Sequence, residues 1–261
     1  MLKRHSWMLA LVVLAGCGSG EPAQQQAAGL TATPGPVETA PPTAQEGAAA
    51  ESPAPAQPSV AAAPSNTAPP PTTGRFQLGT HYTRLSPTQP TSSSPDQVEV
   101  AEVFWYGCPH CYALDPFIAS WLKRKPEHVS FVRVPGVGNP LWKLHGRAFY
   151  TAEVLGKGAE MHDALFREIH QNGNLLDTED KLRDFFAKFN VSAADFKSNF
   201  DSFAVHTKLQ RAEELNRRYR VSGVPAIVVN GKYFTDVTMA GGHEQLIELI
   251  DELVAAERAG K

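Results

Sequence analysis

Residues 99–112, EVAEVFWYGCPHCY, join a strand-like apolar segment to a pair of cysteines, Cys108 and Cys111. Pro109 suits the first turn of a helix, because its missing N–H needs no partner there. Two cysteines with this spacing at a helix start can close and reopen a disulfide, since the helix N-terminus stabilises a thiolate. His110, when protonated, adds positive charge beside the sulfurs. The stretch therefore predicts a redox-active dithiol at the start of a helix.

Three other uses of a cysteine pair compete with this one. A structural zinc site needs about four ligands, whereas the chain has 3 cysteines and no histidine pair at a spacing that completes a site. Covalent haem attachment requires histidine directly after the second cysteine, and Tyr112 stands there. An inert structural disulfide stays open, although the strand–turn–helix context favours a reactive one. We expect neither a metal nor a cofactor.

The first 17 residues have the pattern of a bacterial lipoprotein export signal. Residues 7–15 form an apolar run that is too short to remain in a bilayer as a spanning helix. The run ends in LAGC at residues 14–17, which resembles a lipobox, so Cys17 is expected to carry lipid after cleavage. Gly18, by the same resemblance, favours sorting to the outer membrane. The alternative is an ordinary cleaved signal with an incidental cysteine.

Composition divides the rest of the chain into two parts. Residues 18–74 are rich in Ala, Pro, Gln, Thr and Ser and cannot bury enough apolar surface to fold, so we expect a disordered tether. A mucin-like or partner-binding Pro-rich segment is the alternative. Residues 75–261 are long enough for one domain with its own core. The net charge of −3 gives no reason to expect nucleic acid as a partner.

Within the predicted domain, hydrophobic periodicity indicates an alternation of strands and helices. Strands are expected at 76–85, 98–105, 129–134, 227–229 and 233–234, and helices after Cys108, throughout a block at about 138–204, and at 205–219 and 244–258. Asn230-Gly231 is a hairpin turn signal. Without the helical block, a βαβ unit followed by a hairpin and a helix remains. The expected class is therefore α/β, a thioredoxin-like fold with an inserted all-helical domain, and the aromatic stripes of the block are interpreted as core.

Two stretches, FWYGCPHCY at 104–112 and VSGVPAIVVNGKY at 221–233, make the chain resemble the DsbA family of thiol:disulfide oxidoreductases. The resemblance covers about residues 76–256 and leaves out the tether and the lipobox. It implies that Cys108 is the exposed nucleophilic cysteine and Cys111 the buried resolving one. It also implies a low thiol pKa and an oxidising disulfide, for which DsbA is the standard example.

The resemblance assigns three further residues. Pro225 matches the cis-proline of the family, and the backbone of Val224 before it is expected to pair with an extended substrate peptide. Glu102 matches a buried acidic residue under the active site, where burial would raise its pKa and let it hold or relay the proton of Cys111. An ordinary polar strand position is the alternative for Glu102. Arg133 is a candidate for its basic partner.

The expected function is donation of the Cys108–Cys111 disulfide to reduced exported proteins in the bacterial periplasm. Reoxidation by a membrane partner of the DsbB type is implied by the resemblance alone. A reductase or isomerase would use the same dithiol in the opposite direction, and a peptide-holding or adaptor lipoprotein would not use it catalytically. We expect a lipid-anchored monomer, because the sequence offers no dimerisation module.

Overall fold

The computed structural model describes residues 74–260, so the predicted export signal, Cys17 and nearly all of the predicted tether lie outside the described residues. The strands are β1 (Thr83–Arg84), β2 (Val98–Phe104), β3 (Val129–Pro135), β4 (Ala226–Val229) and β5 (Tyr233–Thr235). The helices are α1 (Pro109–Leu122), α2 (Pro140–Val154), α3 (Gly158–His170), α4 (Glu179–Ala187), α5 (Ala193–Phe200), α6 (Phe203–Arg218), α7 (Val237–Ala240) and α8 (His243–Ala259). The predicted α/β class is confirmed.

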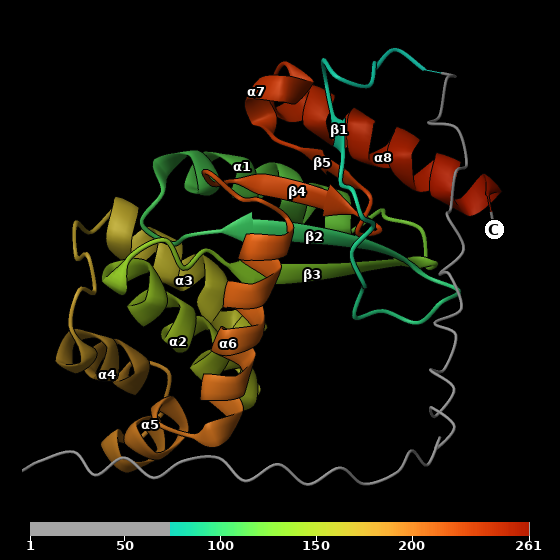
Figure 1. The fold of residues 1–261 in the computed structure, drawn as a ribbon. Helices are drawn as coiled ribbons and strands as arrows, with labels where there is room; N and C mark the ends of the chain where they lie inside the picture. The colour runs from blue at the N-terminus through green and yellow to red at the C-terminus, as the bar shows by residue number, and fades with distance from the viewer. Residues whose placement is uncertain (1–73, 261) are drawn as a thin grey trace, which may run out of the picture. The chain divides into compact units, whose positions relative to one another are not determined.

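The strands form one mixed sheet in the order β1-β5-β4-β2-β3 (Figure 1). Only β2 and β3 run parallel, and the other neighbouring pairs are antiparallel. β2 has a partner on each side, and all of its residues are buried. Its alternate side chains therefore enter two different apolar layers, as a strand covered on both faces requires.

Each face of the sheet supports its own apolar layer. Val98 and Val100 pack in a cluster with the buried faces of α1 and α8. Ala101 and Val103, which point the other way, belong to the cluster built by α2 to α6. Because α1 begins directly after the turn at the end of β2, its first residues lie where the two clusters approach each other.

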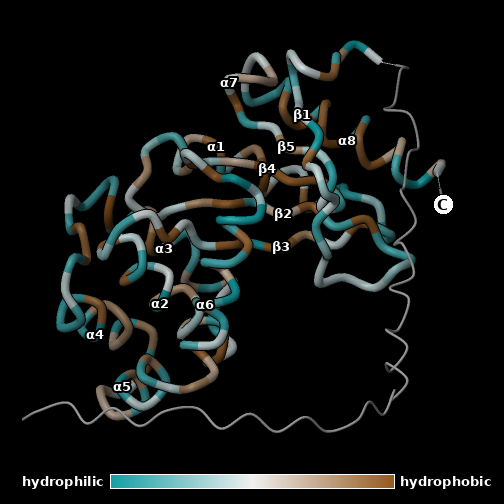
Figure 2. Tube along the Cα trace, viewed as in Figure 1, coloured by the Kyte–Doolittle hydropathy of each residue, from teal (hydrophilic) through white to brown (hydrophobic). Residues whose placement is uncertain are grey.

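The helices α2 to α6 form a block beside β3 (Figure 1). Four of them begin with a side chain that accepts a backbone N–H of the first turn, which satisfies donors that the helix leaves unpaired; the capping residues are Asn139, Thr178, Ser192 and Ser202. At the start of α5 the backbone N–H of Asp195 donates to the Ser192 hydroxyl, which in turn donates to the Asp195 carboxylate. Hydrophobic and hydrophilic residues alternate along these helices (Figure 2), as expected where one side is buried.

The predicted edge strand at 76–85 is wrong in extent. Only Thr83 and Arg84 pair with β5, and Leu78 and Tyr82 form an isolated bridge. The cause is a tight turn at Gly79, which has a φ of 86° and donates its N–H to the Tyr82 carbonyl at 2.8 Å. The segment therefore turns back on itself instead of extending along the sheet. The helix α1 continues through Pro116.

The predicted hairpin is confirmed and lies next to the predicted cis-proline. Asn230 and Gly231 have φ values of 51° and 63°, the left-handed conformation that this turn requires. β4 starts immediately after Pro225, and the Val224–Pro225 peptide bond is cis, as the sequence predicted. A second cis bond, Ser86–Pro87, was not predicted.

Candidate active site

The cysteine pair lies at the N-terminus of α1. The N–H of Cys108 donates to the Trp105 carbonyl at 3.0 Å, which closes the turn between β2 and the helix. Cys108 is the N-cap, and Pro109 opens the helix as predicted. Both Cys108 and Cys111 are free thiols, with exposed fractions of 7% and 0%. The predicted exposure of Cys108 is therefore wrong in degree: both side chains are buried, and the backbone of Val224 lies against the Cys108 sulfur. Cys108 is nevertheless the more accessible of the two sulfurs.

The thiol of Cys108 is acidic. Its pKa is lowered to about 6, first by a hydrogen bond from the Cys111 thiol, against an opposing effect of burial. The backbone N–H groups of Cys111 and His110 and the charge of His110 contribute further. At pH 7 this thiol is therefore mostly thiolate. His110 itself is exposed, and its charge is a smaller contribution than the neighbouring thiol.

Cys111 has the opposite character. Burial, followed by the hydrogen bond to Cys108, raises its pKa far above the ordinary value, and the nearby charge of Glu102 acts in the same direction. The difference between the two sulfurs separates their chemistry. Cys108 is stable as an anion, whereas Cys111 holds its proton.

The cis-proline loop borders the exposed side of the sulfur. Cys108 Sγ lies 3.4 Å from the carbonyl oxygen of Val224, to which the thiol donates in its protonated form. Pro225 is buried, while Val224 remains half-buried. The fold thus brings the two stretches singled out in the sequence, 104–112 and 221–233, into contact at this sulfur.

Glu102 is buried in β2 and paired with Arg133, the partner suggested by the sequence. Arg133 donates from Nε to Glu102 at 3.2 Å and from a terminal nitrogen to Asp115 at 3.1 Å. Burial raises the pKa of Glu102 to about 7, although Arg133 opposes the shift. Arg133 therefore joins two carboxylates, one on β2 and one on α1, beside the redox pair.

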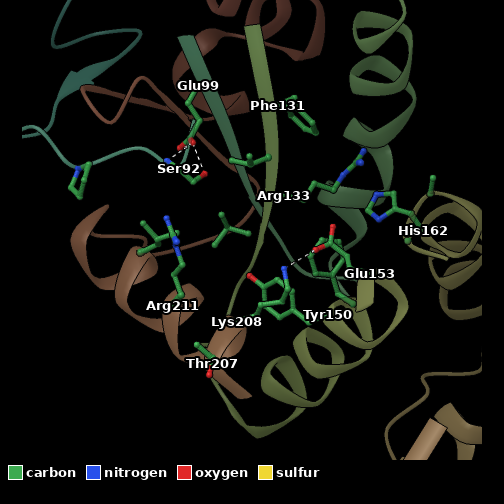
Figure 3. Close-up of a pocket in the computed structure, with 17 residues that line it drawn as sticks. Ser92, Glu99, Phe131, Arg133, Tyr150, Glu153, His162, Thr207, Lys208 and Arg211 are labelled. Carbon is green, nitrogen blue, oxygen red and sulfur yellow. Dashed lines mark hydrogen bonds and ion pairs between the residues drawn. The ribbon is translucent and has the colours of Figure 1, made fainter. Parts of the chain in front are cut away.

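A cavity of about 570 Å³ lies between β3, α2 and α6, away from the cysteines. Arg133 and His162 lie together on one side of it, and Ser92 and Glu99 lie at the other end (Figure 3). One carboxylate oxygen of Glu99, Oε2, accepts hydrogen bonds from the backbone N–H and the hydroxyl groups of Ser92 and Ser93. Within residues 74–260, no group of three or more His, Cys, Asp or Glu side chains is arranged to hold a metal ion.

Comparisons with known proteins agree with this geometry. Residues 143–253 match the DSBA-like thioredoxin domain, a match that begins after the cysteine pair. The thiol:disulfide interchange protein DsbA of Pseudomonas aeruginosa is 41% identical over 184 residues, which are 70% of this chain and 87% of that protein. The chain belongs to the DsbA family. A Burkholderia cepacia DsbA is 34% identical over 67% of this chain and 83% of its own length.

Solved DsbA structures show the same fold. The crystal structure of P. aeruginosa DsbA covers 70% of the chain and 95% of its own, with a TM-score of 0.67 at 41% identity. DsbA of Xylella fastidiosa gives a TM-score of 0.65 at 32% identity, over 69% of this chain and 96% of that one. The DsbA assignment confirms the predicted thioredoxin-like fold. The protein is a periplasmic thiol:disulfide oxidoreductase.

Several residues around this DsbA site were missed in the sequence. Asp115 and the three histidines His145, His162 and His170 have no role assigned from the sequence. His162 and His170 are eight residues apart on α3 and so share a face, which is the one signal that could have drawn attention to them. Their contacts are made across the fold and cannot be read from one sequence. No helix among residues 74–260 is long and apolar enough to cross a membrane.

Proposed function

We propose that the protein donates its Cys108–Cys111 disulfide to reduced exported proteins. The observation that carries this proposal is the contrast between an acidic Cys108, the more accessible of the two sulfurs, and a Cys111 that keeps its proton. A stable thiolate favours the reduced enzyme, so the corresponding disulfide is a strong oxidant.

The reaction proceeds by two thiol–disulfide exchanges. A substrate thiolate attacks Cys108 Sγ, a substrate–Cys108 bond forms, and the Cys108–Cys111 bond breaks. Cys111 leaves as a thiolate and takes up a proton, which its raised pKa favours. A second substrate thiolate then attacks the substrate sulfur of the mixed disulfide and releases Cys108 as a thiolate. The substrate loses two electrons, and the enzyme gains them.

Val224 and Glu102 have supporting roles in this proposal. The carbonyl oxygen of Val224 lies 3.4 Å from the reacting sulfur, and an extended substrate peptide would use the same backbone edge beside Pro225. Glu102 would exchange a proton with Cys111, because a carboxyl with a pKa of about 7 is present in both protonation states near neutral pH.

The cellular setting belongs to the same proposal. Residues 1–17 act as an export signal, Cys17 carries lipid, and residues 18–74 tether the domain, with the outer membrane as the destination. Reduced enzyme is reoxidised by a membrane protein of the DsbB type. The support is the lipobox in the sequence and the likeness to the family.

The test is the equilibrium of the cysteine pair against glutathione, measured by thiol trapping in the chain carrying Cys17→Ser. That substitution leaves Cys108 and Cys111 as the remaining thiols. Half-reduction in a strongly oxidising buffer is the expected result. A pair that stays oxidised until the buffer is strongly reducing would instead identify a reductase or a structural disulfide, the second candidate for this dithiol.

A further inference from the structure

The aromatic side chains of the turn before Cys108 form hydrogen bonds with histidines of the helical block, α2 to α6. The indole N–H of Trp105 donates to Nδ1 of His145, on α2, at 3.0 Å, and Nε2 of His145 donates to the carbonyl of Leu175 at 3.0 Å. Because an indole nitrogen can only donate, His145 must be neutral with its proton on Nε2. Burial lowers the pKa of His145, which favours this form.

The next residue of the turn is held twice by α3. Tyr106 Oη lies 3.0 Å from Nδ1 of His162, and His162 Nε2 lies 3.1 Å from Asp115. The carboxylate accepts from Nε2, so the neutral ring accepts the tyrosine O–H at Nδ1. His170 Nε2 donates to the backbone carbonyl of Tyr106 at 2.7 Å. Figure 3 shows His162 beside Arg133, the residue that shares Asp115 with it.

The residues that these hydrogen bonds hold, Trp105 and Tyr106, are close to both sulfurs through the backbone of Trp105. The Trp105 carbonyl accepts the N–H of Cys108, and the backbone of Trp105 also hydrogen-bonds to the sulfur of Cys111. An added Cβ at Gly107 would lie 2.3 Å from the Trp105 ring, so the turn is closed tightly around this indole. A displacement of the turn therefore moves Cys108 relative to the N–H groups and the thiol that stabilise its charge.

We propose that His145, His162 and His170 are positioning residues for the redox reaction: from the helical block they fix the turn 105–107, and thereby Cys108, in the geometry that stabilises its thiolate. The inference rests on the proposed role of Cys108. All three histidines come from α2 and α3, so the helical block takes part in the redox reaction. Their hydrogen bonds go to Trp105 and Tyr106, so they act on Cys108 indirectly. Stabilisation of a charge depends on donors that are held in place before the charge forms.

The experiment removes one tie at a time from the full chain carrying Cys17→Ser. Tyr106→Phe deletes the oxygen that meets His162 and keeps the ring. His170→Leu removes the donor to the Tyr106 carbonyl, and His170→Gln restores an N–H at the position of Nε2. The pH at which Cys108 ionises is followed by thiolate absorbance, and the glutathione equilibrium by thiol trapping.

We expect Tyr106→Phe and His170→Leu to raise the pH of Cys108 ionisation and to make the protein about three- to tenfold less oxidising, the range for loss of one hydrogen bond. His170→Gln should recover most of both values. His206→Leu, at an exposed position of α6, is the matched control. Val191→Ala, in the core of the block, controls for lost stability alone. His170 is half-buried, so the His170 pair decides the test if Tyr106→Phe does not fold.

Variants that are less stable but ionise and equilibrate like the wild type would overturn the inference. A wild-type pair that is not oxidising would contradict the proposed function instead, and the two failures are therefore distinguishable.

Discussion

Several groups lower the pKa of Cys108, and they do so by different amounts. The thiol of Cys111 and backbone N–H groups contribute more than the charge of His110. His110→Ser keeps the backbone and removes only that charge, so we expect the glutathione equilibrium to become about two- to fivefold less oxidising, as for a partly solvated charge pair. His206→Ser, on the exposed side of α6, should leave it unchanged. An unaltered equilibrium in His110→Ser would remove His110 from the redox centre.

Glu102 links the same site to stability. Its pKa rises from 4.5 to about 7 on folding, so the folded state keeps a proton that the unfolded chain loses. The raised pKa of Glu102 therefore adds to the free energy of unfolding. This contribution is fully present below pH 4.5 and is lost as the pH rises through about 7. Glu102→Gln cannot titrate. Between pH 4.5 and 8 the wild type should lose on the order of 3 kcal/mol relative to Glu102→Gln.

Denaturant unfolding of both proteins at several pH values checks this prediction. Other titrating groups are common to the two chains, so the difference between the curves isolates residue 102. Parallel curves would mean that Glu102 is ionised in the folded protein throughout this range.

At the scale of elements, the turn between β4 and β5 requires a glycine at position 231. Gly231 has a φ of 63°, and a Cβ there would lie 2.0 Å from the backbone oxygen of Gln89. Gly173 has a similar φ of 69° with nothing within 4 Å. Gly173→Ala should lower the free energy of unfolding by about 1 kcal/mol through backbone strain alone, and Gly231→Ala by at least about 2 kcal/mol. Equal losses would show that Gln89 moves aside freely.

The hairpin also illustrates what one sequence can predict. Three local patterns each produced the expected element: Asn230-Gly231 at the hairpin turn, the strand before Gly107, and Pro109 at the helix start. The predicted edge strand was wrong because the apolar residues Phe76 and Tyr82 gave the segment a strand-like pattern. Both are buried, but the chain between them turns at Gly79. Arg133 could be suggested only because it lies on the neighbouring predicted strand. His145 and His170 meet the active-site turn through helix packing, and the only local signal is the helix face that His170 shares with His162.

At the scale of the whole molecule, we expect membrane anchoring through Cys17 to be independent of the redox equilibrium of Cys108 and Cys111. The redox centre is complete within residues 74–260, whereas Cys17 lies outside them. If Cys17 carries lipid, Cys17→Ser should move the protein from the membrane fraction to the soluble periplasmic fraction and abolish incorporation of labelled fatty acid. Two hydrophobic chains are needed for stable anchoring, so loss of the lipidated residue should release the protein almost completely.

The redox equilibrium of the released protein should equal that of the lipidated protein, because no bond in the described active site involves the N-terminal segment. A chain in which Ser-Gly-Thr repeats replace residues 19–73 but Cys17 is kept provides the matched control. It should stay in the membrane fraction with the same equilibrium, since it changes the tether and not the anchor. Membrane association that survives Cys17→Ser would show that the N-terminal apolar run, or a partner protein, holds the enzyme instead of a lipid.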